Sequence, residues 1–159
     1  MEEQKKKKYS PEAALLKIQS WCAYQERSQQ EARDKLYEYG LWPEAVESII
    51  ADLITQNFLN EERFAIAFTG GKFRIKKWGR VKIKIALKQK RVSDYCIKKA
   101  LQEIDEDEYM KTLEQVIAKK SRELQEKNPI KRKYKLLQYA YSRGFEQDLI
   151  LDVMKDSEE

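Results

Sequence analysis

The 159-residue sequence has no histidine, only two cysteines, five glycines and three prolines. Because histidine is absent, no side chain has an unperturbed pKa near neutrality, and the chain can form neither a Ser-His-Asp triad nor a histidine-ligated metal site. Cys22 and Cys96 cannot close a tetrahedral zinc site by themselves. Each lies among apolar residues at helical spacing, so we expect both to be buried, unreactive thiols. The scarcity of glycine and proline excludes collagen-like, linker-like and turn-rich all-β chains.

Long apolar runs and phosphate-binding loops are missing as well. The longest stretches without charge, such as residues 18–25 and 64–71, are far shorter than the ~18 residues of a membrane-spanning helix. Residues 1–8 lack the apolar region of a secretory signal, so we expect a cytoplasmic protein without a membrane partner. No glycine motif has the spacing of a phosphate-binding loop, and the acidic run 105–108 is more typical of a helix N-terminus than of a magnesium site. We therefore expect no enzymatic activity, cofactor, metal or small-molecule substrate.

Apolar residues at helical spacing occupy nearly the whole chain. The first helix is predicted over residues 11–24, with Ser10 as its N-cap and proline at its first position. The second spans residues 28–40, begins with the capping-box spacing of Ser28 and Glu31, and ends at a glycine. A third runs from residue 42 to about residue 56. Residues 81–85 alternate like a strand, but their surroundings favour a helix.

The helical pattern recurs about every fifty residues. A shift of 51 places aligns six apolar positions of the first part with the second, and a shift of 53 aligns the third part with the second. The first shift brings Gly40 onto Arg91, and the second brings Gly144 onto the same residue. We therefore predict an all-α fold, an elongated array of three tandem three-helix repeats. The predicted boundaries are a basic mobile tail at 1–8, repeat 1 at 9–59, repeat 2 at 60–104, and repeat 3 at 105–159 with an acidic C-terminal tail.

Charge is distributed unevenly along the chain. Residues 72–99 contain 12 basic side chains and one acidic one, whereas residues 1–71 contain 9 basic and 12 acidic ones. Such segregation is typical of contact with a polyanion or an acidic partner. Four bases have the spacing of one helical stripe, which suits contact with a phosphate backbone: Arg80, Lys84, Lys88 and Arg91. We expect these charges to be exposed and to contribute little to folding stability.

These bases, the aromatic residues beside them and a second basic group in the third repeat form the predicted contact surface. Phe73 and Trp78 interleave with the bases upstream of the stripe. The predicted nucleic-acid or filament contacts are Lys72, Arg74, Lys76, Lys77, Arg80, Lys84, Lys88, Lys90, Arg91, Lys131, Arg132, Lys133 and Lys135. The alternative is that the lysines only solvate a surface helix.

Three stretches of the sequence resemble one bacterial family. They are residues 27–36 (RSQQEARDKL), followed by Gly40, then 58–65 (FLNEERFA) and 78–87 (WGRVKIKIAL). They resemble RecX, a family of recombination regulators. At the end of the second stretch and just beyond it, Phe64, Ile66 and Phe68 could form a recognition surface, but their helical spacing favours the core. We assign Arg63 a structural role, in an ion pair near Glu61 and Glu62 or stacked in the turn. Arg91 replaces the glycine that commonly ends the middle repeat's central helix in that family.

The resemblance implies a function as well as a fold. It implies a curved, all-helical protein that lies in the groove of the RecA nucleoprotein filament and contacts both recombinase and DNA. Such a protein would restrain ATP hydrolysis and strand exchange during recombination and DNA repair without chemistry of its own. The implied partners are the RecA filament, single-stranded DNA and double-stranded DNA.

Two other functions fit the residues alone. The second and third helices of each repeat resemble a helix-turn-helix, which would make the chain a sequence-specific DNA-binding protein. No base-reading pattern stands out on any third helix, so backbone contact is the stronger expectation. A helical scaffold that binds only an acidic protein is the remaining alternative.

Overall fold

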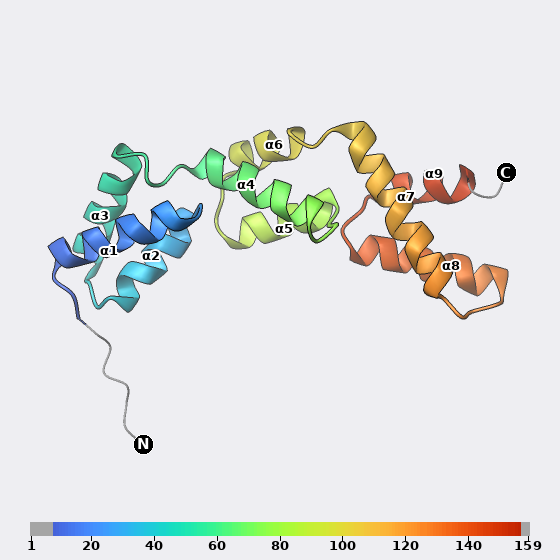
Figure 1. The fold of residues 1–159 in the computed structure, drawn as a ribbon, viewed down its shortest axis with the longest axis horizontal. Helices are drawn as coiled ribbons and strands as arrows, with labels where there is room; N and C mark the ends of the chain where they lie inside the picture. The colour runs from blue at the N-terminus through green and yellow to red at the C-terminus, as the bar shows by residue number, and fades with distance from the viewer. Residues whose placement is uncertain (1–7, 157–159) are drawn as a thin grey trace, which may run out of the picture.

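The computed structural model describes residues 8–156, and this range contains nine α-helices and no strand. In groups of three they follow the long axis of the molecule, so that α1 and α9 lie at opposite ends (Figure 1). The bounds are α1 Pro11–Tyr24, α2 Gln29–Glu38, α3 Pro43–Thr55, α4 Glu61–Arg74, α5 Arg80–Gln89, α6 Asp94–Gln102, α7 Glu106–Glu123, α8 Pro129–Ser142 and α9 Gln147–Asp156. The predicted all-α repeat array is confirmed, and residues 81–85 lie within α5 as expected.

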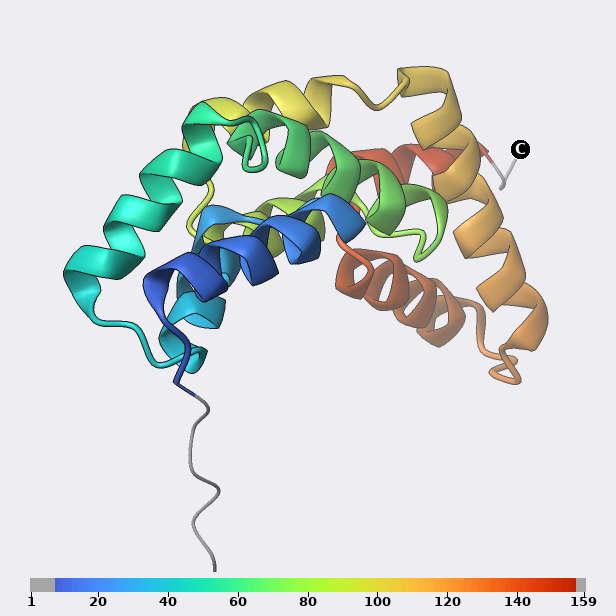
Figure 2. The same ribbon diagram turned by 60° about the vertical axis from the view of Figure 1, so that its left-hand side comes forward.

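The array is curved. Seen after a turn of 60°, the chain forms an arc with α6 and the start of α7 along one edge and α8 toward the opposite edge (Figure 2). Of the predicted basic tail, residues 1–7 lie outside the described part of the chain. The acidic C-terminal segment is helical as far as Asp156, and residues 157–159 also lie outside the described part.

Local sequence signals determine where the helices begin. The Ser10 hydroxyl accepts a hydrogen bond from the N–H of Ala13, and Ser28 and Glu31 form the predicted capping box. Asp105 caps α7, and residues 106–108 supply carboxylates to its first turn. The acidic run thus offsets the positive end of a helix dipole, as the sequence indicated.

Each repeat ends its second helix with the same left-handed turn. The turn residues Gly40, Arg91 and Gly144 have φ values of 90°, 60° and 98°. After each turn an N–H bonds to the carbonyl five residues earlier: Leu41 to Leu36 (3.3 Å), Val92 to Leu87 (3.1 Å) and Phe145 to Ala140 (3.3 Å). The two shifts that align the sequence therefore superpose one Schellman turn three times. Arg91 adopts at this position a backbone conformation that normally requires glycine.

The buried side chains form two cores. One belongs to the first repeat and is built on Ile18, Leu36 and Leu53. The other runs without interruption through the second and third repeats, with Phe64 buried in it and Ile66 and Phe68 packed against it. Cys22 and Cys96 are buried as predicted, and burial raises the pKa of the Cys22 thiol to about 11. That thiol therefore stays protonated near neutral pH.

The second and third repeats meet through their backbones. The N–H of Gly79 donates to the carbonyl of Arg143 (2.8 Å), and the N–H of Val81 donates to that of Gly144 (2.9 Å). A Cβ atom on residue 79 would lie 2.3 Å from the Gly144 carbonyl oxygen. Only glycine at this position permits so close an approach of the two repeats.

A buried tyrosine of α7 fills the same junction. The ring of Tyr109 stacks on Phe73 and packs against Phe145, with centroid distances of 5.8 and 5.3 Å. Its hydroxyl accepts a hydrogen bond from the N–H of Arg80 (3.1 Å) and donates one to Glu146. Burial, and next the bond to Glu146, raise the pKa of Tyr109 well above its ordinary value, so the hydroxyl remains a donor.

Arg80 completes this junction, and the expectation that it is an exposed charge is wrong. Its guanidinium lies 3.9 Å from the centroid of the Tyr109 ring and pairs with Glu146 (2.7 Å) and Glu106. Only 20% of its side chain is exposed. The sequence could not reveal this role, because Glu146 lies 66 positions away. Arg80 therefore joins two repeats.

The first and second repeats meet through polar contacts. Arg63 donates to Glu26 (2.5 Å) and to the side chain and carbonyl of Asn57 (3.2 and 3.1 Å), and Lys90 pairs with Glu31 (3.5 Å). Arg63 is structural, as expected, but its carboxylate partner is in the first repeat instead of at Glu61 or Glu62.

We predict that Arg80→Ala lowers the free energy of unfolding by about 2–3 kcal/mol, because it removes two ion pairs and leaves Glu146 partly buried without a cation. Lys84→Ala, one turn farther along the exposed face, is expected to change it by less than about 0.5 kcal/mol. Urea denaturation of both variants and the parent tests this. Equal stability of the Arg80 variant and the parent would contradict the structural role of the junction.

The three equivalent turns predict opposite effects of exchanging glycine. Arg91→Gly should raise the free energy of unfolding by about 1 kcal/mol, because it relieves a left-handed side-chain conformation. Gly144→Ala should lower it by more than about 1 kcal/mol, since the new Cβ would also lie 2.4 Å from Cβ of Lys82. Thermal unfolding of the two variants tests this pair, and the reverse order of stability would be inconsistent with a shared turn.

Candidate nucleic-acid interface

The second repeat carries a groove lined with cations between α5 and α6. Its volume is about 480 Å³, and Arg80, Lys84 and Lys88 of α5 line it together with Lys98 of α6. Ile97 and Leu101 form its apolar part, and Asp94 and Glu106 are its acidic residues. Arg80 is held by carboxylates, and Lys88 lies 3.9 Å from the exposed Asp94. Lys84 and Lys98 are exposed and have no ion pair with any residue between 8 and 156.

The predicted four-residue stripe is therefore shorter than expected. Arg91 lies beyond the C-terminal end of α5, in the left-handed turn, and so cannot continue the helical face. Arg80 lies on the helix but is bound to Glu106 and Glu146. What remains on the exposed face of α5 is Lys84 and Lys88, and Lys98 joins them from the next helix.

A second group of bases lies at the end of α4 and in the loop after it, and Lys82 of α5 joins it. Lys72 and Lys82 lie over the ring of Trp78, at 4.8 and 4.6 Å from its centroid, while Arg74, Lys76 and Lys77 are exposed. Phe73 is different: it is buried and stacked on Tyr109. The predicted interleaving of aromatic and basic side chains thus holds for Trp78 and is wrong for Phe73.

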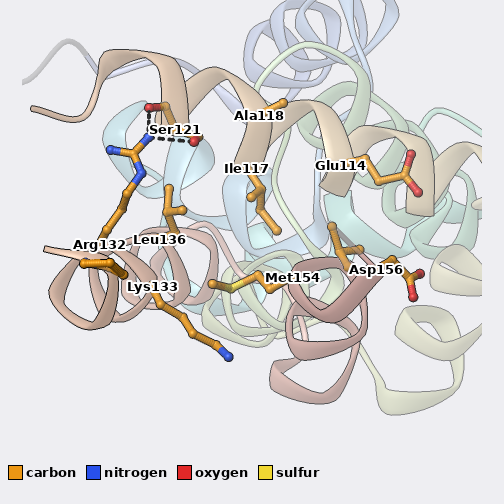
Figure 3. A pocket seen from close by; sticks show the side chains of 11 residues that line it. Glu114, Ile117, Ala118, Ser121, Arg132, Lys133, Leu136, Met154 and Asp156 are labelled. Carbon is orange, nitrogen blue, oxygen red and sulfur yellow. Dashed lines mark hydrogen bonds between the residues drawn. The ribbon is translucent and has the colours of Figure 1, made fainter. Parts of the chain in front are cut away.

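The basic residues of the third repeat also divide into two kinds. Arg132 reaches back to the end of α7, where it donates to the Ser121 hydroxyl (2.8 Å) and to the carbonyls of Leu124 and Glu126 (both 3.1 Å); Figure 3 shows its bonds to Ser121. It ties α7 to α8 and is not available as a surface contact. Lys135 pairs with Glu126 (3.1 Å), and Lys131 and Lys133 are exposed.

A hollow of about 560 Å³ lies between α7, α8 and α9 (Figure 3). Ile117, Leu136 and Val153 supply apolar walls, and Glu114 and Asp156 also line it. Sequence reasoning did not find this hollow, because helical spacing identifies core positions without showing where they fail to fill the space.

No arrangement suited to metal binding occurs among residues 8–156: His, Cys, Asp and Glu side chains form no group of three that could hold an ion. Within the same range, no helix combines the length and apolar character needed to cross a membrane.

Sequence reasoning missed two basic contributors. Lys98 lines the groove, and Lys82 covers Trp78. Both belong to the basic segment 72–99, but neither falls on the helical stripe chosen from spacing within one helix. A groove between two helices depends on how they pack, which the spacing within either helix does not reveal.

The chain matches known three-helix domains. Residues 60–101 match the second three-helix domain of RecX, and residues 106–154 match the third. The regulatory protein RecX of Lactobacillus johnsonii is 32% identical over 144 residues, which cover 91% of this chain and 53% of the relative. That of Bacillus mycoides is 26% identical over 149 residues, covering 92% and 55%. The chain thus spans about half the length of the curated relatives it matches.

Solved structures have the same fold. The crystal structure of RecX from Lactobacillus salivarius superposes with a TM-score of 0.82 at 19% identity, covering 92% of this chain and 95% of that one. A second crystal structure of regulatory protein RecX gives a TM-score of 0.78 at 21% identity, covering 89% and 73%. Because the two matched domains follow each other in the chain, and the relatives align over about nine-tenths of it, the chain belongs to the RecX family.

Proposed function

We propose that this chain is a non-catalytic regulator that binds the RecA–DNA filament and restrains ATP hydrolysis and strand exchange. The observation that supports this most directly is the cationic groove of the second repeat, in a chain whose relatives are named regulatory protein RecX. Lys84, Lys88 and Lys98 offer mobile point charges on one face, which is the chemistry that a phosphate backbone attracts.

The types of side chain that line the groove favour contact with the DNA backbone over recognition of the base sequence. Lysines dominate the groove, and the base-reading forks of asparagine, glutamine and arginine are rare there: Gln102 is its one amide, and Arg80 is bound to carboxylates. Phosphate contacts fix position and carry no sequence information. A regulator of a filament that forms on any DNA needs this type of contact, whereas a helix-turn-helix protein needs direct contacts with base edges.

To restrain the filament without catalysing a reaction, the chain needs only to bind one state of the filament more tightly than another. A ligand shifts an equilibrium by as much as it prefers one state over another. An elongated array with its cations concentrated in the second and third repeats can contact several neighbouring units of a long filament. If the chain binds more tightly to the filament state in which ATP hydrolysis is slow, it slows ATP hydrolysis and strand exchange together.

We expect the triple variant Lys84→Ala, Lys88→Ala, Lys98→Ala to weaken binding to single-stranded DNA and to flatten its dependence on salt. Each phosphate contact on a single strand contributes about −0.7 to the slope of log affinity against log salt, so the slope should become less steep by about two units. Arg80 is left intact because its loss would disturb the repeat junction. The measurement is a salt titration of binding for variant and parent.

A control variant that loses three lysines outside the groove distinguishes an effect of the groove itself from a general effect of net charge. Lys111, Lys119 and Lys127 are exposed in the third repeat, outside the groove, and changing all three to alanine should leave the slope nearly unchanged. Thermal unfolding confirms that both variants fold. Equal flattening in the two would indicate a general effect of net charge, and an unchanged slope in the groove variant would indicate that its lysines only solvate the surface.

Binding to the filament itself is tested by co-sedimentation. The full chain should pellet with RecA assembled on single-stranded DNA and should lower the rate of ATP hydrolysis by the filament, while the groove variant should do both less well at equal concentration. Preference for one duplex sequence over all others would favour a helix-turn-helix function. Pelleting with RecA that is unaffected by the groove variant would favour a scaffold that contacts protein alone.

A further inference from the structure

The outer face of α8 carries an exposed stripe of large apolar side chains. Ile130, Tyr134 and Tyr141 are 82%, 58% and 60% exposed, and the half-buried Leu137 lies between the two tyrosines. At the helical rotation of about 100° per residue, these four side chains fall within about 60° of one another. Ile130, Tyr134 and Tyr141 are exposed, whereas Leu137 also packs against the core that contains Leu136 and Ala140. Such an exposed patch at a regular spacing indicates an interaction surface.

Both tyrosines, Tyr134 and Tyr141, are more than half exposed. Gln138 donates a hydrogen bond to the Tyr134 hydroxyl (2.9 Å). Among residues 8–156, no cation or aromatic ring lies over Tyr134 or Tyr141. The next tyrosine of the same helix differs, because Lys120 lies 4.8 Å from the ring centroid of Tyr139.

The repeat symmetry relates this stripe to the basic one. The shift of 53 that superposes the turns of the two repeats places Leu137 on Lys84 and Tyr141 on Lys88. The same face of the second helix is thus cationic in the second repeat and aromatic in the third. Both helices lie below α6 and the start of α7 in Figure 1, one after the other along the array.

Lysines accompany the aromatic stripe. By helical rotation, Lys131 and Lys135 follow one side of it and Lys133 the other. Lys131 is exposed and has no ion pair with any residue between 8 and 156. A ligand that fits must therefore combine flat, stackable groups with negative charge.

We infer that the stripe Ile130, Tyr134, Leu137 and Tyr141 stacks unpaired bases of single-stranded DNA whose phosphates follow the lysines of α5 and α8. Single strands expose base faces beside phosphates, whereas a duplex hides those faces inside its stack. The inference rests on the proposed function and adds to it a preference for single-stranded over double-stranded DNA. That preference resides on the third repeat and is separate from the phosphate contacts of the second.

The test compares three probes: a thymidine oligomer, an abasic oligomer of equal length and a duplex. Changing Tyr134 and Tyr141 to alanine should weaken binding of the thymidine oligomer by at least about fivefold for each base that is stacked, with no change for the abasic oligomer or the duplex. Changing both to phenylalanine should preserve binding, because the ring is retained. Tyr24→Ala, at an 83% exposed tyrosine in the first repeat, is the matched control and should have no effect.

The outcomes separate this inference from the proposed function. Unchanged binding of the thymidine oligomer by the alanine variant, or an equal loss on all three probes, overturns the inference and leaves the groove experiment intact. Loss in the phenylalanine variant as large as in the alanine variant also overturns it. If the parent chain binds none of the three probes, the proposed DNA contact fails together with the inference. Thermal unfolding of each variant verifies that the fold is preserved.

Discussion

The close approach of Gly79 and Gly144 is the constraint on which the rest of the array depends. It brings the start of α5 within hydrogen-bonding distance of the turn after α8 and leaves room for the Tyr109 ring between the two repeats. One continuous core then runs through both repeats. Tyr109 and Arg80 make this contact specific, because the contacts of the tyrosine ring, its hydroxyl and the guanidinium can all form only in one relative orientation of the two repeats. The orientation of α5, and with it of its lysines, follows from that junction.

Arginine and lysine have different tasks in this molecule. Arg63, Arg80 and Arg132 each bind several acceptors and join segments that are distant in the chain or in adjacent helices. The planar, forked guanidinium suits such joints, whereas the flexible, strongly hydrated ammonium of lysine remains at the surface. A count of positive charge therefore overestimates the contact surface wherever arginines contribute. The candidate interface is thus mainly a surface of lysines, joined by the exposed Arg74, and Arg63, Arg80 and Arg132 hold the framework beneath it together.

Features determined by neighbouring residues could be predicted from the sequence, and features determined by distant ones could not. Caps such as Ser10 and the Ser28–Glu31 box depend on three or four adjacent positions, and helical spacing identified the core. The turn at Arg91 emerged from the alignment of repeats in spite of its missing glycine. The partners of Arg80 and Arg63 lie 66 and 37 positions away, so no local pattern could assign them. For the same reason Lys98 was missed, since it meets Lys84 only after two helices have packed.

The two joints of the array differ in kind, and this gives the molecule unequal stiffness along its length. The second and third repeats share one core, and separating them would expose Tyr109 and Phe145 to water. The first repeat has its own core and meets the second through the ion pairs of Arg63 and Lys90, which weaken as salt screens them. The orientation of the first repeat is therefore held by contacts that depend on ionic strength, whereas that of the third repeat is held by a shared core that does not.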